Sequence, residues 1–521
     1  MQDLAIKLSM LLVFFAVMVG IGLYCRRHAT DVSGFVLGGR SVGPWLTAFA
    51  YGTSYFSAVV FVGYAGQFGW KYGIAATWAG LGNAFLGSLL AWAVLGRRTR
   101  VMTQHLDSAT MPEFFGKRFG SRPLKLAASV IIFIFLIPYT ASLYNGLSRL
   151  FGMAFDIDYS VCVVVMAVLT GVYVIAGGYM ATAINDFVQG IIMIVGIIAV
   201  IAAVLHSHGG FMAAIEGLAQ VSDPAVSQAP GVFASFFGPD PAGLLGVVLL
   251  TSLGTWGLPQ MVQKFYAIKS EKSINTGMVI STAFAVIVSG GCYFLGGFGR
   301  LYSAEIDVAA DGYDAIIPTM LSDLSTVLIA VTVILVLSAS MSTLSSLVLA
   351  SSSTLTLDFI KDNLIKDMDE RRQVRWMRAL VVVFIAISVV LAIIQYQSNV
   401  TFIAQLMGIS WGALAGAFLA PFLYALYWKR TTKAACAASF LFSTVVMLCN
   451  IFFADFFPSL LQSSINCGAF CMLAGLVIVP VVSVLTRAPE QSRLQEIFSC
   501  YDRTVTVTVK DSIGRGGERR K

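Results

Sequence analysis

Hydroxyl side chains crowd one apolar segment of this 521-residue chain, between residues 324 and 357. In a helix, Ala339, Ser342 and Thr343 would stand at i, i+3 and i+4 and would share one face. A sodium ion, like magnesium and calcium, is a hard cation that prefers oxygen ligands. One carbonyl and two hydroxyls on that face would supply three of the roughly five oxygens required. The pattern predicts a cation site of uncharged oxygens; the alternative is hydroxyls that bond only their own or a neighbouring helix.

Two other apolar segments contain residues that interrupt a helix and so expose backbone carbonyls. Segment 244–265 holds Gly254, Gly257 and Pro259, and segment 44–67 holds the polar patch 52–57. Proline removes a helical hydrogen bond, and glycine weakens a helix. Many secondary transporters contain two inverted repeats, each with a broken helix whose unwound middle binds substrate and ion. The positions of these two interrupted segments along the chain therefore predict a five-plus-five inverted repeat. The alternative is that Gly and Pro are simply commoner in membrane helices.

Asp186 is a carboxylate placed between two apolar segments, and its position leaves two interpretations open. At the membrane interface it would complement a helix N-terminus. Pointing inward it would be costly, at about 2.5–3.5 kcal/mol on insertion scales, and its presence would then indicate a function.

The elements that position these residues are membrane helices. The chain is 57% hydrophobic and 12% charged, against about 25% charged in soluble domains. A bilayer core about 30 Å thick needs roughly 20 apolar residues as a helix, and continuous apolar runs are not barrel strands. Thirteen such segments occur, at about 4–25, 44–67, 74–95, 126–150, 159–177, 187–205, 244–265, 276–301, 324–357, 379–396, 402–428, 434–454 and 465–486. A polar turn at Asn185 and Asp186 is expected to separate the fifth segment from the sixth.

The basic residues alternate between connections in a way that predicts the topology. With thirteen helices, 30 of the 34 Lys and Arg fall on one side of the membrane, Lys264 among them. The positive-inside rule then places the N-terminus outside and the C-terminus in the cytoplasm, in the inner (cytoplasmic) membrane. The net charge of +7 is therefore explained by the membrane topology. The expected partners are the lipid bilayer, sodium and a small solute; we expect no nucleic-acid partner and no obligatory protein partner.

The expected organisation is all-α and polytopic, and it has six parts. They are 1–43 (an extra N-terminal helix and loop), 44–205 (first inverted repeat), 206–243 (outer loop), 244–428 (second inverted repeat), 429–486 (two C-terminal helices) and 487–521 (a basic cytoplasmic tail, expected to be disordered).

Several motifs along the chain resemble the solute:sodium symporter family, which includes sodium/proline, sodium/glucose and sodium/sialic acid carriers. The resemblance runs from Gly38 to about Lys433. Its motifs are Phe35–Ser41 with Gly43-Pro44-Trp45, Met111–Phe115 with Arg118-Phe119, Asn185–Gly190, and Ala339–Ser353.

The resemblance implies a LeuT-type fold and specific site residues. Sodium would be bound by the carbonyls of Thr53, Phe56 and Ala339 and by the hydroxyls of Ser342 and Thr343. Asp186 would serve a second sodium site or the ion exit path. The residues implied for the solute are Tyr55, Ser57, Tyr139, Trp256 and Gln260. Tyr55 stands where proline carriers have aspartate and sugar carriers have asparagine, so neither substrate transfers directly.

The expected function is sodium-coupled import of a small polar organic solute (an amino acid, a sugar or a carboxylate) by alternating access. Two alternatives remain: a proton-coupled carrier of the same fold, and a sensor that binds solute without moving it. An enzyme is not expected, because the segments hold no paired carboxylates, metal cluster or activated nucleophile. An aromatic, hydroxyl-rich pocket favours a neutral or zwitterionic solute.

Overall fold

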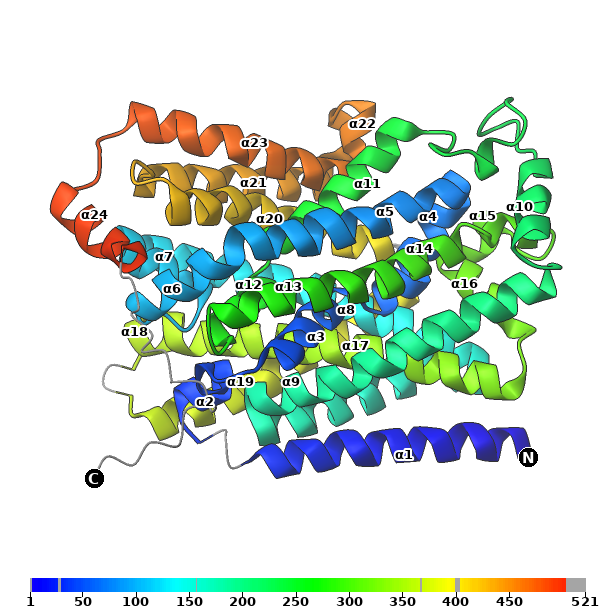
Figure 1. The fold of residues 1–521 in the computed structure, drawn as a ribbon, viewed down its shortest axis with the longest axis horizontal. Coiled ribbons are helices and arrows are strands. Elements are labelled where there is room, and N and C mark those ends of the chain that lie inside the picture. The colour runs from blue at the N-terminus through cyan, green and yellow to red at the C-terminus, as the bar shows by residue number, and fades with distance from the viewer. Residues whose placement is uncertain (1, 27–29, 156, 366–367, 399–402, 503–521) are drawn as a thin grey trace, which may run out of the picture.

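The computed structural model is built from long helices that run roughly side by side (Figure 1). It describes residues 2–26, 30–155, 157–365, 368–398 and 403–502. The first half contains α1 (Gln2–Cys25), α2 (Val32–Leu37), α3 (Pro44–Tyr55), α4 (Ala65–Tyr72), α5 (Thr77–Gly82), α6 (Arg97–His105), α7 (Met111–Phe119), α8 (Arg122–Phe155), α9 (Tyr159–Ser207), α10 (Phe211–Gln220), α11 (Pro241–Leu253) and α12 (Pro259–Ala267). The second half contains α13 (Lys272–Ala285), α14 (Gly291–Gly296), α15 (Val308–Asp311), α16 (Ile316–Ser322), α17 (Thr326–Thr354), α18 (Lys361–Asn363), α19 (Glu370–Ser398), α20 (Ile403–Tyr427), α21 (Lys433–Phe453), α22 (Ser459–Gln462), α23 (Ser464–Leu485) and α24 (Gln491–Phe498). Shorter helical turns link some of these, among them η3 (Val59–Tyr64), η4 (Gly73–Ala76), η5 (Asn83–Leu90) and η8 (Gly254–Trp256).

The outer helices expose apolar side chains that a soluble protein would bury. Leu12 on α1 is 71% exposed, and Leu485 at the end of α23 is 79% exposed. Within the described residues, ten helical stretches are long and apolar enough to cross a bilayer, or eleven with the bent α11–α12 pair. The chain is therefore a multi-pass, nearly all-helical membrane protein. The predicted number of thirteen differs because some of these stretches are longer than one expected segment.

The first predicted helix break is confirmed. α3 ends at Tyr55, and Phe56 has an extended backbone (φ −87°, ψ 120°) before the chain turns helical again in η3. An extended residue cannot continue the i→i−4 hydrogen-bond ladder, so carbonyls in the last turn of α3 lose their helical partners.

The second predicted break is also confirmed. α11 tightens into η8, and Leu258 is extended (φ −78°, ψ 124°) before Pro259 opens α12. The two arms are bent by 41°. Pro259 is tolerated there because the first turn of a helix has no use for its missing N–H.

The predicted turn at Asn185 and Asp186 is wrong. Both residues are buried inside α9, and the break lies at Gly178, whose φ of 55° and ψ of −149° are not helical. Only glycine adopts this backbone region readily. Polarity misled the sequence interpretation, because a buried carboxylate can stay in a helix whereas a reversal needs a backbone that L-residues avoid.

The expectation of a disordered tail from residue 487 is wrong for its first part. Residues 491–498 form α24, which buries Leu494, Ile497 and Phe498. Its apolar face therefore packs on the bundle. The segment 503–521 lies outside the described residues.

α17 is the central helix of the bundle. Every residue from Thr332 to Thr354 except Ile334 is buried, and the helix packs against α9, α8 and α3. Buried hydroxyls are usually hydrogen-bonded. Those of Ser342, Thr343 and Ser346 bond to groups of α3, so these three mark the contact between the two helices.

The glycine at the α9 break provides a test of the fold. Gly178→Ala should lower the midpoint of thermal unfolding, at a cost of about 1–3 kcal/mol, because a side chain there adopts a disfavoured backbone. Its Cβ would also lie 2.9 Å from the Phe35 carbonyl oxygen. The control is Gly20→Ala in α1, where a Cβ meets nothing within 4 Å. Equal midpoints for the two purified variants would contradict this account of the break.

Candidate functional site

Two hydroxyls of α17 converge on the broken end of α3. The Ser342 Oγ donates to the Thr53 carbonyl at 2.9 Å, and the Thr343 Oγ1 lies 3.2 Å from the carbonyls of both Thr53 and Phe56. Both hydroxyls also lie within 3.2 Å of the Ala339 carbonyl in their own helix. Three carbonyls and two hydroxyls therefore form one cluster.

This cluster exists because of the break in α3. In an unbroken helix the Thr53 carbonyl would accept from the N–H of Ser57, but the extended Phe56 removes that geometry. Thr53, Ser342 and Thr343 have no measurable exposure, and Phe56 is 1% exposed. A buried carbonyl without a partner is costly, so α17 hydroxyls stabilise the opened backbone.

A second polar chain lies beside the cluster and includes a lysine that the sequence analysis assigned to the membrane surface. The Lys264 side chain is 2% exposed, and its Nζ donates to the Ser346 Oγ at 3.0 Å. Ser346 in turn shares a 2.9 Å hydrogen bond with Ser54, the residue after Thr53. Lys264 is thus part of the interior and does not count toward the topological charge.

Asp186 points inward and faces this lysine. Its Oδ2 lies 3.9 Å from the Lys264 Nζ, and the Tyr179 ring lies 5.1 Å from the same ammonium. Within the described residues neither carboxylate oxygen of Asp186 accepts a hydrogen bond. Of the two interpretations left open by the sequence, the structure excludes the helix-capping one, because Asp186 lies far inside α9. Lys264 was the missed partner, and its place on the same helix face as Gln260, four residues earlier, was the available signal.

Three of the residues expected to contact solute carry buried polar atoms with no hydrogen-bond partner of regular geometry in the described part of the chain. These atoms are the Ser57 Oγ, the Tyr139 Oη and both side-chain polar atoms of Gln260. The Ser57 and Trp411 side chains both lie near the Tyr139 hydroxyl, so Ser57 and Tyr139 belong to one group of polar atoms. Unsatisfied buried polar groups are rare in native proteins and call for an explanation, such as a ligand.

Two tryptophans border this region, and the sequence analysis named one of them. The Trp256 indole donates to the Leu86 carbonyl at 2.9 Å, so its N–H is already used. The missed residue is Trp411 on α20, whose ring meets that of Tyr139 edge-on with centroids 5.9 Å apart. Its indole N–H has no hydrogen-bond partner of regular geometry among the described residues, although the Tyr139 hydroxyl lies near it. A tryptophan inside an otherwise apolar segment was the signal, since its N–H needs an acceptor.

The structure places Tyr55 as the last residue of α3, and its side chain lies outside the described part of the structure. Gln260 stands at the start of α12, which packs against α3. The break regions of both spans are also tied to η5, because Tyr51 and Thr255 each donate to the Gly87 carbonyl.

The candidate site is buried from both ends of the molecule. Ser57, Tyr139, Trp256 and Gln260 are all at most 7% exposed. Cavities of about 230 and 570 Å³ lie elsewhere, near α15. A solute can therefore reach these residues only if the helices around them move.

Comparison with known families identifies the chain. The model of the sodium:solute symporter family matches residues 35–443. The chain is 28% identical over 486 residues to the osmoregulated proline transporter OpuE of Bacillus subtilis (strain 168), covering 92% of this chain and 95% of the relative. It is 28% identical over 499 residues to a sodium/proline symporter of Staphylococcus aureus, covering 92% and 93%.

Solved structures agree on the fold. A sodium-coupled sialic acid symporter in a substrate-bound outward-open state matches with a TM-score of 0.72 at 16% identity, covering 93% of this chain and 99% of that one. A nucleobase-cation-symport-1 family transporter in a closed conformation matches with a TM-score of 0.50 at 14% identity, covering 89% and 98%.

A family match over most of the chain decides between the alternatives that the sequence left open. The coupling ion is sodium, and the protein is a transporter and not an enzyme. The chain belongs to the sodium:solute symporter family and carries a small solute across the cell membrane together with sodium.

Proposed function

We propose that sodium binds in the five-oxygen cluster of α3 and α17 and that a small zwitterionic solute of the amino-acid class binds beside it. The single observation that carries this proposal is the convergence of the Ser342 and Thr343 hydroxyls on the Thr53 and Phe56 carbonyls. Uncharged oxygens suit an ion that must be released again. A cation among them would replace the hydroxyl protons as the partner of the carbonyls.

The solute class is supported by the chemistry of the unsatisfied atoms. The Tyr139 O–H and the Trp411 N–H are donors without a regular hydrogen bond, and Gln260 has both a donor and an acceptor. An amino-acid carboxylate and ammonium would use both kinds. The relatives named for proline support the same class. Because Tyr55 stands where the resemblance implies aspartate in proline carriers, we propose the amino-acid class and no single amino acid.

The mechanism we propose is alternating access across two inverted repeats, 44–205 and 244–428. The ten stretches become thirteen spans when 59–105 is divided at Gly73, 159–207 is divided at Gly178, and the bent pair counts as one. Both glycines have φ near 60° and ψ near −145°, which supports a reversal at each. Sodium holding α17 against α3 would complete the solute site, and each charge moved inward gains about 2.3 kcal/mol per 100 mV.

The orientation we propose places the N-terminus outside and the C-terminus in the cytoplasm, in the inner membrane. α6, α7, α18 and α24 lie at one end of the bundle and the N-terminus of α1 at the other (Figure 1). The basic end should face the cytoplasm by the positive-inside rule.

We propose that Asp186 lies on the sodium exit path. Its carboxylate is buried, faces the Ser54–Ser346 pair through Lys264, and accepts no hydrogen bond among the described residues. The Lys264 ammonium is the cation nearest to it, at 3.9 Å. A sodium ion leaving the cluster toward Asp186 would therefore have to displace this ammonium.

The sodium site is tested by replacing both hydroxyls. The double variant Ser342→Ala, Thr343→Ala should abolish the sodium dependence of solute uptake or raise the half-saturating sodium concentration at least 10-fold. Losing a hydrogen-bond-type contact to a charge costs about 1.5–3 kcal/mol. Uptake into proteoliposomes at graded sodium concentrations measures this.

The matched control is Ser353→Ala, a buried serine of the same helix whose hydroxyl bonds only its own helix. Its sodium affinity should be that of the unmodified chain. A second control keeps a hydroxyl at position 343: the single variant Thr343→Ser should retain most of the sodium affinity that the double variant loses. Unchanged sodium affinity in the double variant would refute the site.

The solute site is tested by a glutamine pair on α12. Gln260→Leu should lower solute affinity about 10-fold or more yet leave thermal stability unchanged or raised, because it removes two unsatisfied buried atoms. Gln263→Leu should instead lower stability, since the Gln263 Nε2 donates to the Val36 carbonyl at 3.0 Å. Solute-dependent thermal shifts with proline, sugars and carboxylates, each with and without sodium, measure both effects. Loss of stability without loss of affinity in Gln260→Leu would argue against a solute contact.

The Asp186–Lys264 pair is tested by a double-mutant cycle. Asp186→Asn should destabilise the protein by about 3–5 kcal/mol because it strands a buried ammonium, and adding Lys264→Met should restore most of that loss. Uptake should stay low in the double variant if the carboxylate serves the sodium path. Full recovery of uptake together with stability would show that the pair is structural only.

A further inference from the structure

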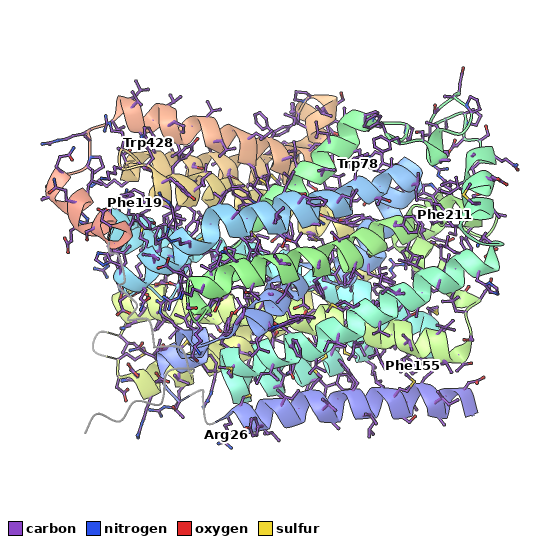
Figure 2. The ribbon with its side chains drawn as sticks, in the orientation of Figure 1. Arg26, Trp78, Phe119, Phe155, Phe211 and Trp428 are labelled. Carbon is purple, nitrogen blue, oxygen red and sulfur yellow. The ribbon has the colours of Figure 1, made fainter. Side chains whose placement is uncertain are left out.

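A cavity of about 420 Å³ lies at the basic end of the bundle, and none of the residues assigned to sodium or solute lines it. It is bounded by the end of α7, the start of α21 and the link from α23 into α24. Phe119, which lines it, lies at this end beside α24 (Figure 2). We propose that this cavity binds the phosphate group of an anionic phospholipid.

Four basic side chains line the cavity, against a single carboxylate. The basic residues are Arg118, Lys433, Arg487 and Arg493, and the carboxylate is Glu490. Among the described residues none of these five takes part in an ion pair, whereas the nearby Lys117 and Lys125 do. The cavity therefore has an excess of positive charge that the described residues leave unneutralised.

Of the four basic residues, Arg118 gives the strongest indication of a bound anion, because it is buried and has an unused donor. Its side chain is 1% exposed, and its Nε donates to the Ala425 carbonyl at 3.1 Å. The rings of Phe119 and Phe498 each lie 4.9 Å from the guanidinium carbon. The Nη2 has no hydrogen-bond partner in the described part of the chain. A buried cation with a spare donor is costly unless an anion pairs with it.

A second guanidinium, that of Arg493, lines the same cavity. Arg493 donates to the Lys117 carbonyl at 2.7 Å, and its Nη1 lies only 2.0 Å from where a Cβ on Gly120 would stand. Gly120 has a positive φ of 59°, a conformation that favours glycine in the turn after α7. The absence of a side chain at Gly120 also leaves room for the Arg493 guanidinium. Burial lowers the pKa of Arg118 to about 10, and Arg493 adds to that effect. An anion between the two guanidinium groups would oppose it, and guanidinium forks suit phosphate oxygens.

The start of α21 adds a third element. Thr432 caps this 21-residue helix, and Lys433 is its first residue. A helix N-terminus carries a partial positive charge and favours phosphate. The cavity thus combines guanidinium groups, an ammonium and a helix terminus.

The neighbouring surface favours a lipid over a soluble phosphate compound. α23 ends at Leu485, only two residues before Arg487. Val481, Val484 and Leu485 are 50%, 62% and 79% exposed. A ligand with a phosphate head and acyl chains would place its head in the cavity and its chains along this apolar face of α23. Basic pockets beside membrane helices bind such headgroups.

The test uses the purified full-length chain after removal of co-purified lipid. The probes are dioleoyl-phosphatidylglycerol, dioleoyl-phosphatidylcholine and inorganic phosphate, and the readouts are lipid adducts by native mass spectrometry and the unfolding midpoint. The test variant is Lys433→Gln, Arg487→Gln, Arg493→Gln. The matched control removes three exposed basic side chains of α19: Arg371→Gln, Arg372→Gln, Arg375→Gln.

Phosphatidylglycerol should bind the unmodified chain and the control variant, and raise their unfolding midpoints, more than phosphatidylcholine does. The test variant should bind it roughly 100-fold more weakly, since each basic side chain near an anionic headgroup contributes a factor of about five. An equal effect of inorganic phosphate would support the phosphate site but assign it to a soluble ligand.

The proposal is overturned if phosphatidylglycerol binds no better than phosphatidylcholine, or if the test variant and the control variant lose affinity equally. Should the triple variant fail to fold, Arg487→Gln alone, on an exposed link, should still weaken binding about fivefold. Unchanged affinity in that variant would also overturn the proposal.

Discussion

The opened backbone of α3 is the constraint on which the rest of the structure depends. Inside a bilayer no water satisfies a carbonyl that has lost its helical partner, so the protein itself must do so. α17 meets this need with the Ser342 and Thr343 hydroxyls. The same contacts stabilise the break and gather five neutral oxygens in one place. Structural satisfaction of the backbone and the proposed affinity for a small cation would thus have one physical origin.

The second broken span obeys the same constraint through different partners. Thr255 and Trp256, at the end of η8, donate to carbonyls of η5, and Tyr51 of α3 donates to the same Gly87 carbonyl as Thr255. η5 therefore ties the two breaks together. Because the interior is close-packed, a shift of the backbone at one break should displace the backbone at the other. Such coupling is what the proposed alternating-access mechanism would require.

The predictions that succeeded rested on local chemistry. Glycine, proline and hydroxyl residues change what a helix can do wherever they stand, so the breaks at Phe56 and Leu258 and the shared face of Ala339, Ser342 and Thr343 could be inferred from spacing. The predictions that failed needed knowledge of neighbours. Lys264 looked like a surface charge because it follows an apolar run, and the reversal at Gly178 was missed because Asp186 is the more polar residue.

By itself, the amino-acid sequence determined that the chain is a multi-pass helical membrane protein of the sodium:solute symporter family, with two broken helices and a hydroxyl-rich helix in its second half. Hydropathy and motif order need no tertiary contact. The tertiary structure alone decided that Asp186 faces Lys264, that Trp411 meets Tyr139, and that Arg118 and Arg493 share a cavity. Each of these pairs joins residues far apart in the chain, and no helical periodicity encodes which distant face a side chain will meet.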